Sequence, residues 1–267
     1  MLSVGIIGLG TIGSVVAKAL DDGIAGMKLV AVASGRREKA IANLANLSSS
    51  VDVMTIDEVS ERSEIVVDCA PKSVFYDIAV AAFSRGRTLV TVSGAGILAN
   101  DDIEEMAKEN GGQLVLATGA LLGLDAVRAA AEGTINSVRM ITRKPPNALR
   151  DAPHIIDKKI SLDRLNGAIQ VFKGSAREGA IAFPANVNVA AALGLAGLGA
   201  DATELEVWAD PHLDRNTHSI EVDSDSAKFS LKIENVQSES NPGTGKITAL
   251  SVIACLRGMT APLKVGS

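Results

Sequence analysis

Three glycines near the N-terminus restrict what this chain can fold into more than any other feature. An apolar run, Val4–Ile7, leads directly into Gly8-Leu9-Gly10-Thr11-Ile12-Gly13, and an apolar-periodic stretch follows to Leu20. This order predicts a β-strand, a tight turn and an α-helix. In such a unit the first glycine permits the turn, the second lets a phosphate approach the backbone, and the third allows close packing of helix and strand.

The N-terminus of the predicted helix offers backbone N–H donors and a partial positive charge, which suit a dinucleotide pyrophosphate. We therefore expect contacts with a nicotinamide cofactor from Gly8, Gly10, Thr11, Ile12 and Gly13. The alternative is a tight turn without a ligand, since Gly-rich turns are common. The position between an apolar strand and a helix favours the cofactor.

The end of the second apolar run, Lys28–Ala33, bears on which cofactor fits. Enzymes strict for NAD usually carry an acidic residue about 20 residues past the glycines, where it binds the ribose 2′-hydroxyl. Here Ser34 stands in that place, and Arg36 and Arg37 follow. We expect Ser34 and Arg36 to contact the cofactor, and either NAD or NADP to be accepted. The alternative is that the arginines only begin a solvated helix.

Composition limits the class of protein. The 267 residues are 47% hydrophobic and 21% charged, with 3% aromatics, which is typical of globular domains whose core is built from small aliphatic side chains. A net charge of −5 gives no reason to expect nucleic acid or a membrane as partner. We see no signal peptide and expect reduced Cys69 and Cys255, so a cytoplasmic protein is predicted.

Strand-like and helix-like segments alternate over residues 1–118, which predicts an α/β domain with a doubly wound parallel sheet, the Rossmann arrangement. The expected strands are Val4–Ile7, Leu29–Ala33, Ile65–Asp68, Thr88–Val92 and Leu114–Leu116.

The pattern changes over residues 119–244, where widely spaced strand-like segments predict a smaller α+β domain with a mixed or antiparallel sheet. We expect this domain to bind substrate and to oligomerise. Residues 223–227 predict a hairpin turn, and a helix within 245–267 is expected to pack back on the first domain.

Three further patches could carry chemistry. His218 lies in a polar stretch before a predicted strand and is suited to proton handling, whereas His154 and His212 have no such context. Asn186 and Asn188 precede a small-residue helix, so one can cap it while the other binds a ligand; the alternative is that both are only local caps. The loop around Ala120 follows the fifth strand and allows close approach of a nicotinamide ring. No Cys/His cluster has metal-ligand spacing, so no metal is expected.

The chain resembles the L-aspartate dehydrogenase family over nearly its whole length. The resemblance is carried by Phe183–Ala192, by Asp-Arg-Asn-Thr-His ending at His218, and by Phe229–Arg257 with its Asn-Pro-Gly-Thr-Gly-Lys. It implies that His218 is the catalytic histidine and that Ala120 and either Asn188 or Asn186 contact NAD(P), with Asn188 preferred. One departure is Thr118 with Leu121-Leu122, where the family usually has Ser-Gly-Ala-Ile-(Ala/Gly)-Gly.

The resemblance implies oxidative deamination of L-aspartate to iminosuccinate, which water hydrolyses to oxaloacetate and ammonia, or the reverse amination. Iminosuccinate could also feed NAD synthesis. The substrate carboxylates need cations or N–H donors, and Lys246, Arg143 and Lys144 are candidates. A homodimer is expected, with the exposed sheet face of the second domain as its surface.

Two other functions stay open. A sugar or inositol dehydrogenase would share the layout, but such enzymes resemble one another in Glu-Lys-Pro, whereas here Lys72 follows Pro71. Dihydrodipicolinate reductase is a further layout relative, but its His-His-rich loop is missing. A non-catalytic NAD(P)-sensing module would keep the glycines and need no histidine.

Overall fold

In the computed structural model, residues 1–184, 188–239 and 241–266 are described, apart from the Pro242 side chain. The chain forms two compact units. The first comprises Met1–Gly119 and Thr248–Val265, and the second comprises Ala120–Ile247 with the last two residues.

The first unit is built on a six-stranded parallel sheet in the order β3-β2-β1-β4-β5-β6. Its strands are β1 (Leu2–Ile7), β2 (Met27–Ala33), β3 (Asp52–Met54), β4 (Ile65–Asp68), β5 (Thr88–Thr91) and β6 (Gln113–Leu116). Its helices are α1 (Thr11–Gly23), α2 (Arg37–Leu44), α3 (Ile56–Arg62), α4 (Phe75–Phe83), α5 (Gly94–Ile97), α6 (Ile103–Glu109) and most of α11 (Lys246–Thr260).

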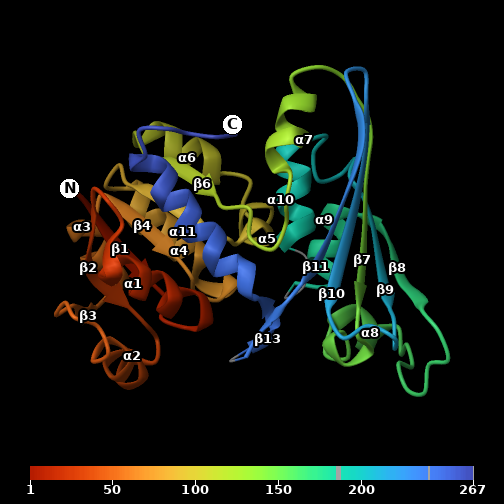
Figure 1. Ribbon diagram of the computed structural model, residues 1–267, viewed down its shortest axis with the longest axis horizontal. Coiled ribbons are helices and arrows are strands. Elements are labelled where there is room, and N and C mark those ends of the chain that lie inside the picture. Colours follow the sequence, from red (N-terminus) through yellow and green to blue (C-terminus); the bar gives the residue numbers. More distant parts are fainter. Residues whose placement is uncertain (185–187, 240, 267) are drawn as a thin grey trace. The chain divides into compact units, whose positions relative to one another are not determined.

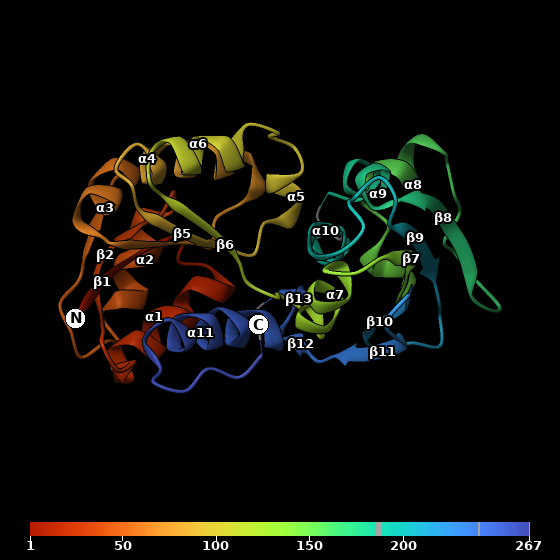
Figure 2. The ribbon, with the colours of Figure 1, turned by 90° about the horizontal axis from the view of Figure 1, so that it is seen from above.

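Each face of this sheet has its own core. Val4 and Ile6 of β1 pack with α1, α2 and α11, whereas Ile7 packs with α3, α4 and α6. Figures 1 and 2 show the two helix layers on opposite faces of the sheet. This follows from the period of two along a strand, which sends neighbouring side chains to opposite faces. The α11 residues Val252 and Leu256 are fully buried, so this late segment completes the first core.

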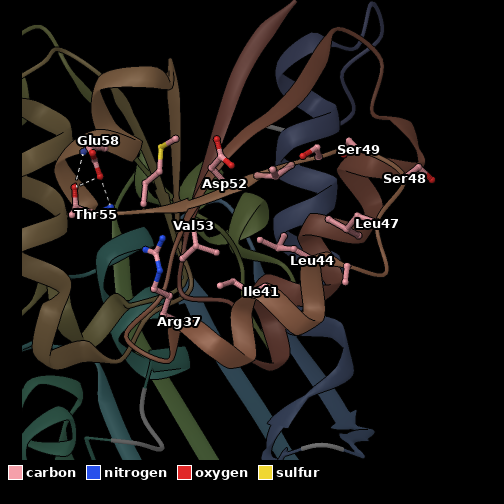
Figure 3. A pocket seen from close by; sticks show the side chains of 14 residues that line it. Arg37, Ile41, Leu44, Leu47, Ser48, Ser49, Asp52, Val53, Thr55 and Glu58 are labelled. Atoms are coloured by element: carbon pink, nitrogen blue, oxygen red, sulfur yellow. Dashed lines mark hydrogen bonds between the residues drawn. The ribbon is translucent and has the colours of Figure 1, made fainter.

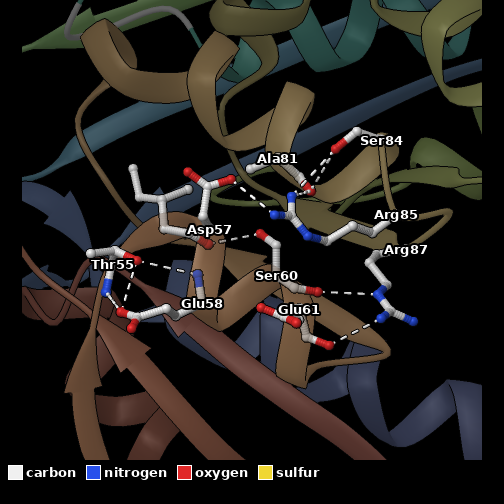
Figure 4. Close-up of polar contacts among 10 residues, drawn as sticks. Thr55, Asp57, Glu58, Ser60, Glu61, Ala81, Ser84, Arg85 and Arg87 are labelled. Carbon is white, nitrogen blue, oxygen red and sulfur yellow. Dashed lines mark hydrogen bonds and ion pairs between the residues drawn. The ribbon is translucent and has the colours of Figure 1, made fainter.

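Helix α3 is fixed at its start by a capping box, in which the Thr55 hydroxyl accepts the Glu58 N–H and the Glu58 carboxylate accepts the Thr55 N–H. Two arginines hold it from the neighbouring segment, as Figure 4 shows. Arg85 pairs with Asp57 at 3.1 Å, and Arg87 donates to the carbonyl oxygens of Ser60 and Glu61.

The second unit contains a five-stranded mixed sheet in the order β11-β10-β7-β9-β8, in which β7 and β9 are parallel and the other pairs antiparallel. Its strands are β7 (Ile135–Lys144), β8 (Ile169–Ser175), β9 (Glu204–Ala209), β10 (Asn216–Ser224) and β11 (Lys228–Asn235), with a small pair β12 (Gln237–Ser238) and β13 (Asn241–Gly245). Its helices are α7 (Leu124–Ala131), α8 (Pro153–Asp157), α9 (Ala176–Ala182) and α10 (Asn188–Ala196). Figure 2 shows α7, α9 and α10 on one face, which leaves an open face on the other side.

The predicted fold class, a doubly wound parallel sheet plus a smaller α+β domain, is confirmed. The hairpin is present, with Asp223 paired to Lys228. Four strands were not predicted: β3, which is only three residues long, β8, and the small pair β12 and β13. The last of these, β13 (Asn241–Gly245), leads directly into α11. Cys69 and Cys255 are unpaired, as expected, and both are half-buried. Among the described residues, no helix is long and apolar enough to cross a membrane.

Asp68 is an ionisable group inside the first core, with only 1% of its surface exposed at the end of β4. Its carboxylate accepts the Thr91 hydroxyl at 2.7 Å and the Ala70 N–H at 3.0 Å. Burial raises the pKa of Asp68 to about 6, although these two hydrogen bonds oppose the change. The folded chain therefore keeps this proton at a pH where the unfolded chain has released it.

We predict that D68N removes a pH-dependent loss of stability. The unfolded carboxyl ionises near pH 4 and the folded one near pH 6, so the free energy of unfolding of the wild type should fall across this window. Relative to D68N, the loss should be of order 2–3 kcal/mol. Urea unfolding of both proteins from pH 4 to pH 7.5 measures it. T91V removes a hydrogen bond to the ionised Asp68 carboxylate, so it should move the window to higher pH. Parallel curves of unfolding free energy against pH for D68N and the wild type would contradict the assignment.

Candidate functional site

The glycine turn after β1 is shaped by contacts within the protein at two of its three glycines. Gly8 has a φ of +95°, and a Cβ there would lie 2.6 Å from backbone atoms of Cys69 and Ala70. A Cβ on Gly13 would lie 1.9 Å from the Gly8 carbonyl oxygen. These two positions accept no side chain because strand, turn and helix pack backbone against backbone.

Gly10 differs, because a Cβ there would meet nothing within 4 Å. Packing within the protein therefore does not require glycine at this position. A ligand that approaches the backbone here would require it, because a side chain would block the approach. Gly10 is also the N-cap of α1, with no side-chain capping hydrogen bond and no acidic residue in the first turn. Thr11 and Ile12 begin the helix and are half-buried. This helix N-terminus fits the pyrophosphate of a dinucleotide.

Ser34 follows the last residue of β2, and its hydroxyl accepts the Arg36 N–H at 3.3 Å. Ser34 is half-buried, and Arg36 and Arg37 are exposed at the start of α2. A cation pair beside a small hydroxyl can bind a 2′-phosphate, and Ser34 carries no charge that would repel one.

A hollow of about 720 Å³ runs along the edge strand β3 (Figure 3). Its lining includes Arg37 and Ile41 of α2, Val53 of β3 and the Thr55–Glu58 capping box. Neither Ser34 nor Arg36 lines it, so the hollow lies beside the end of β2 rather than at it.

In the second unit, His218 lies on β10 with 3% of its surface exposed. It pairs in register with Thr142 of β7, and the Thr142 hydroxyl shares a hydrogen bond of 3.1 Å with Nδ1 of His218. Burial, with a smaller contribution from the charge of Lys144, lowers the pKa of His218 to about 3. The imidazole is therefore uncharged at neutral pH, and it is a weak base as long as no anion lies beside it.

Lys144 is the last residue of β7 and is 4% exposed. It lies two residues beyond Thr142 on β7, so both side chains lie on the same face of the sheet as His218 of β10. Burial lowers the pKa of Lys144 to about 8. Arg143 belongs to the open face, where it lies 3.6 Å from Asp210 and stacks over Trp208.

Two buried asparagines stand at the same end of the sheet. Asn216 of β10 and Asn235 of β11 are paired in register, and each has a buried Oδ1 without a hydrogen-bond partner among the described residues. Asn235 donates through Nδ2 to the carbonyl oxygen of Ala120 at 3.2 Å. The sheet end therefore supports the loop in which a cofactor contact was predicted.

The remaining candidates are spread over the second unit. Asn188 is exposed at the start of α10, and Asn186 lies outside the described residues. His154 packs against Phe172 and Phe183, and Lys246 pairs with the exposed Glu239 at 2.9 Å. Within the described part of the chain, no three His, Cys, Asp or Glu residues gather as a possible metal site.

Sequence reasoning missed Thr142, Asn216 and Asn235. The available signal was the alternation along β7. One face of this strand carries Val138 and Met140 and then Thr142 and Lys144, so polar residues replace apolar ones only at the C-terminal end of the strand.

Two parts of the chain match different family models. Residues 8–117 match one described as homoserine dehydrogenase, NAD binding domain, and residues 125–259 match one described as aspartate dehydrogenase, C-terminal. A crystal structure of aspartate dehydrogenase from Thermotoga maritima superposes with a TM-score of 0.75 at 24% identity and covers 100% of both chains. That likeness supports the fold.

Curated relatives are closer in sequence. The L-aspartate dehydrogenase of Bradyrhizobium diazoefficiens is 51% identical over 266 residues, which is 100% of this chain and 94% of that protein. L-aspartate dehydrogenase 3 of Bordetella bronchiseptica is 46% identical over 100% of this chain and 98% of its own length. Since these matches extend along the whole sequence, the chain belongs to the L-aspartate dehydrogenase family.

Proposed function

We propose that the protein oxidises L-aspartate with NAD or NADP and water, yielding oxaloacetate, ammonia and the reduced cofactor. The observation that carries the proposal is the buried, uncharged His218 beside Lys144, in a chain of this family. His218 as a proton acceptor and Lys144 as a cation lie on one face of the sheet, and together they suit a substrate that combines an amine with carboxylates. The family resemblance also supports the use of iminosuccinate for NAD synthesis.

The first unit would hold the cofactor. Its pyrophosphate would lie on the α1 N-terminus at Gly10 and Thr11, and its adenosine ribose near Ser34 and Arg36. When bound, the nicotinamide supplies the hydride acceptor for the Cα–H of the substrate. Ala120 and Asn188 are proposed as further cofactor contacts on the strength of the resemblance.

His218 would accept a proton, either from the substrate amine or from the water that hydrolyses iminosuccinate. The Thr142 hydroxyl fixes the ring through Nδ1, so Nε2 is the atom proposed to face the reacting groups. Because the imidazole is uncharged, His218 does not serve as a permanent cation for a carboxylate. Binding of an anionic substrate would raise the pKa of His218 and make it a stronger base.

The direct test is the formation of NADH or NADPH, followed by absorbance, when the protein meets L-aspartate and either cofactor. L-glutamate, L-alanine, L-malate and several sugars complete the panel. Turnover with L-aspartate is expected. Turnover with a sugar alone would replace the proposal by the sugar-dehydrogenase alternative, and cofactor binding without any turnover would favour a sensing module.

We predict that H218N lowers kcat by about 10²- to 10⁴-fold, which is the usual contribution of a general base, while cofactor affinity changes little. Asparagine keeps a hydrogen-bonding group for Thr142, so the fold should be retained. Steady-state kinetics and cofactor titration by fluorescence measure both quantities. H212N, on a loop histidine, is the matched control and should keep full turnover. Equal turnover of H218N and wild type would refute the assigned role.

The cofactor prediction concerns the end of β2. S34D places a carboxylate where a 2′-phosphate would lie, so KM for NADP should rise at least about tenfold while KM for NAD changes by a few-fold at most. S34N, similar in size but uncharged, is the matched control and should keep NADP. An equal loss with both cofactors would show that Ser34 does not face the 2′ position.

We further propose a cytoplasmic homodimer that pairs through the open face of the second sheet. Arg139 on this face contacts Glu204 and Glu206, so the face carries both positive and negative side chains. In a two-fold dimer the same face meets itself, and side chains of both signs allow opposite charges to pair across the interface. Light scattering should give about twice 27.5 kDa. I141E, on the half-buried centre of the face, should yield monomers, whereas I181E, on an exposed position of α9, should not. A monomeric wild type would contradict the proposal.

A further inference from the structure

Two amide side chains at one end of the second sheet are buried, and each has an acceptor atom to spare. Asn216 of β10 is 6% exposed and Asn235 of β11 is 3% exposed. The Oδ1 atom of each meets no hydrogen-bond partner in the part of the chain that the structure describes. Buried polar atoms of native proteins are nearly always hydrogen-bonded, so two neighbouring exceptions call for a partner from outside the chain.

The orientation of the Asn235 amide is fixed by the cofactor loop. Its Nδ2 donates to the carbonyl oxygen of Ala120 at 3.2 Å, and a carbonyl can only accept, so the other end of the amide has to be the oxygen. Asn216 and Asn235 are paired in register, which brings their Cβ atoms to about 4.5–5.5 Å from each other on one face of the sheet. A single small group that carries several donors can therefore reach both amide oxygens.

His218 adds a third acceptor to this face. It follows Asn216 by two residues on β10, so both side chains belong to the same face of the sheet. The Thr142 hydroxyl bonds Nδ1 of the uncharged ring, which leaves Nε2 to accept a proton. Two amide oxygens and one ring nitrogen together match the three N–H donors of a substrate ammonium group.

We propose that Asn216 and Asn235 bind the substrate amine through their Oδ1 atoms and make the site prefer an amino group to a hydroxyl group. This inference rests on the proposed function, with the amine as the source of the proton that His218 accepts. The two asparagines would then accept the two N–H groups that remain. A hydroxyl group has one donor only, so it would leave buried acceptors unpaired, which is costly.

The same two hydrogen bonds would strengthen during the reaction. The Cα–H bond breaks and its electron pair leaves with the hydrogen for the nicotinamide, while the nitrogen lone pair forms the C=N bond. The nitrogen keeps both N–H groups and becomes positively charged. Because hydrogen bonds from a charged donor are stronger than those from a neutral one, the two amide oxygens would stabilise the transition state more than the neutral amine.

L-aspartate, L-malate and succinate are the probes, since they differ only in carrying an amino group, a hydroxyl group or hydrogen at one carbon. Calorimetry with saturating NADH measures their Kd values without turnover, because the cofactor is already reduced. N216A and N235A should each weaken L-aspartate at least about tenfold, as expected for a lost hydrogen bond from a charged donor, and succinate by about threefold at most. N166A, on an exposed loop asparagine of the same unit, is the matched control and should leave all three Kd values unchanged.

A purely structural role of the asparagines would weaken L-aspartate and succinate equally, and that result, or unchanged L-aspartate binding, would overturn the inference. Thermal melting shows whether the variants are folded. If they are not, the wild type decides: it should bind L-aspartate at least about tenfold more tightly than L-malate, and equal Kd values would overturn the inference. Failure of the proposed function is seen separately, as absence of L-aspartate turnover in the wild type with NAD or NADP.

Discussion

The pairing of β7 with β10 is the constraint on which the second unit depends. Its register places Thr142 opposite His218 and, by alternation, sends Lys144 to the same buried face. A shift of β7 by one residue would bring Arg143 inward and turn Thr142 and Lys144 outward, away from His218. The apolar residues Val138, Met140, Ile220 and Val222 share the inner face and are nearly fully buried, so hydrophobic burial fixes the register that aligns the polar end.

Burial shifts Asp68, Lys144 and His218 toward their neutral forms. It raises the pKa of Asp68 in the first unit and lowers the pKa of Lys144 and His218 in the second. For Asp68 the two hydrogen bonds it accepts offset part of the cost. For His218 a bound anion would offset part of this cost, because a negative charge in a region of low dielectric stabilises the protonated ring.

The sequence predicted the first unit well because its signals are local. An apolar strand, three glycines and an apolar helix follow one another within twenty residues, and each predicts its own conformation. The polar sheet end was predicted only in part, since Thr142, Asn216 and Asn235 come together through pairing between distant strands. His218 was found through family resemblance, and Lys144 and Arg143 could be told apart only once the register gave each its face. Strand β3 was missed because three residues carry too little periodicity.

The return of the chain into the first unit has a consequence for synthesis on the ribosome. Val252 and Leu256 of α11 are part of the core formed by β1 and α1, yet about 245 residues separate them from β1. The domain whose strands emerge first therefore cannot finish its core until the second domain has also been made. Until α11 arrives, the apolar side chains beneath it are exposed to water, and a chain stalled just before α11 is a natural target for chaperones and proteases.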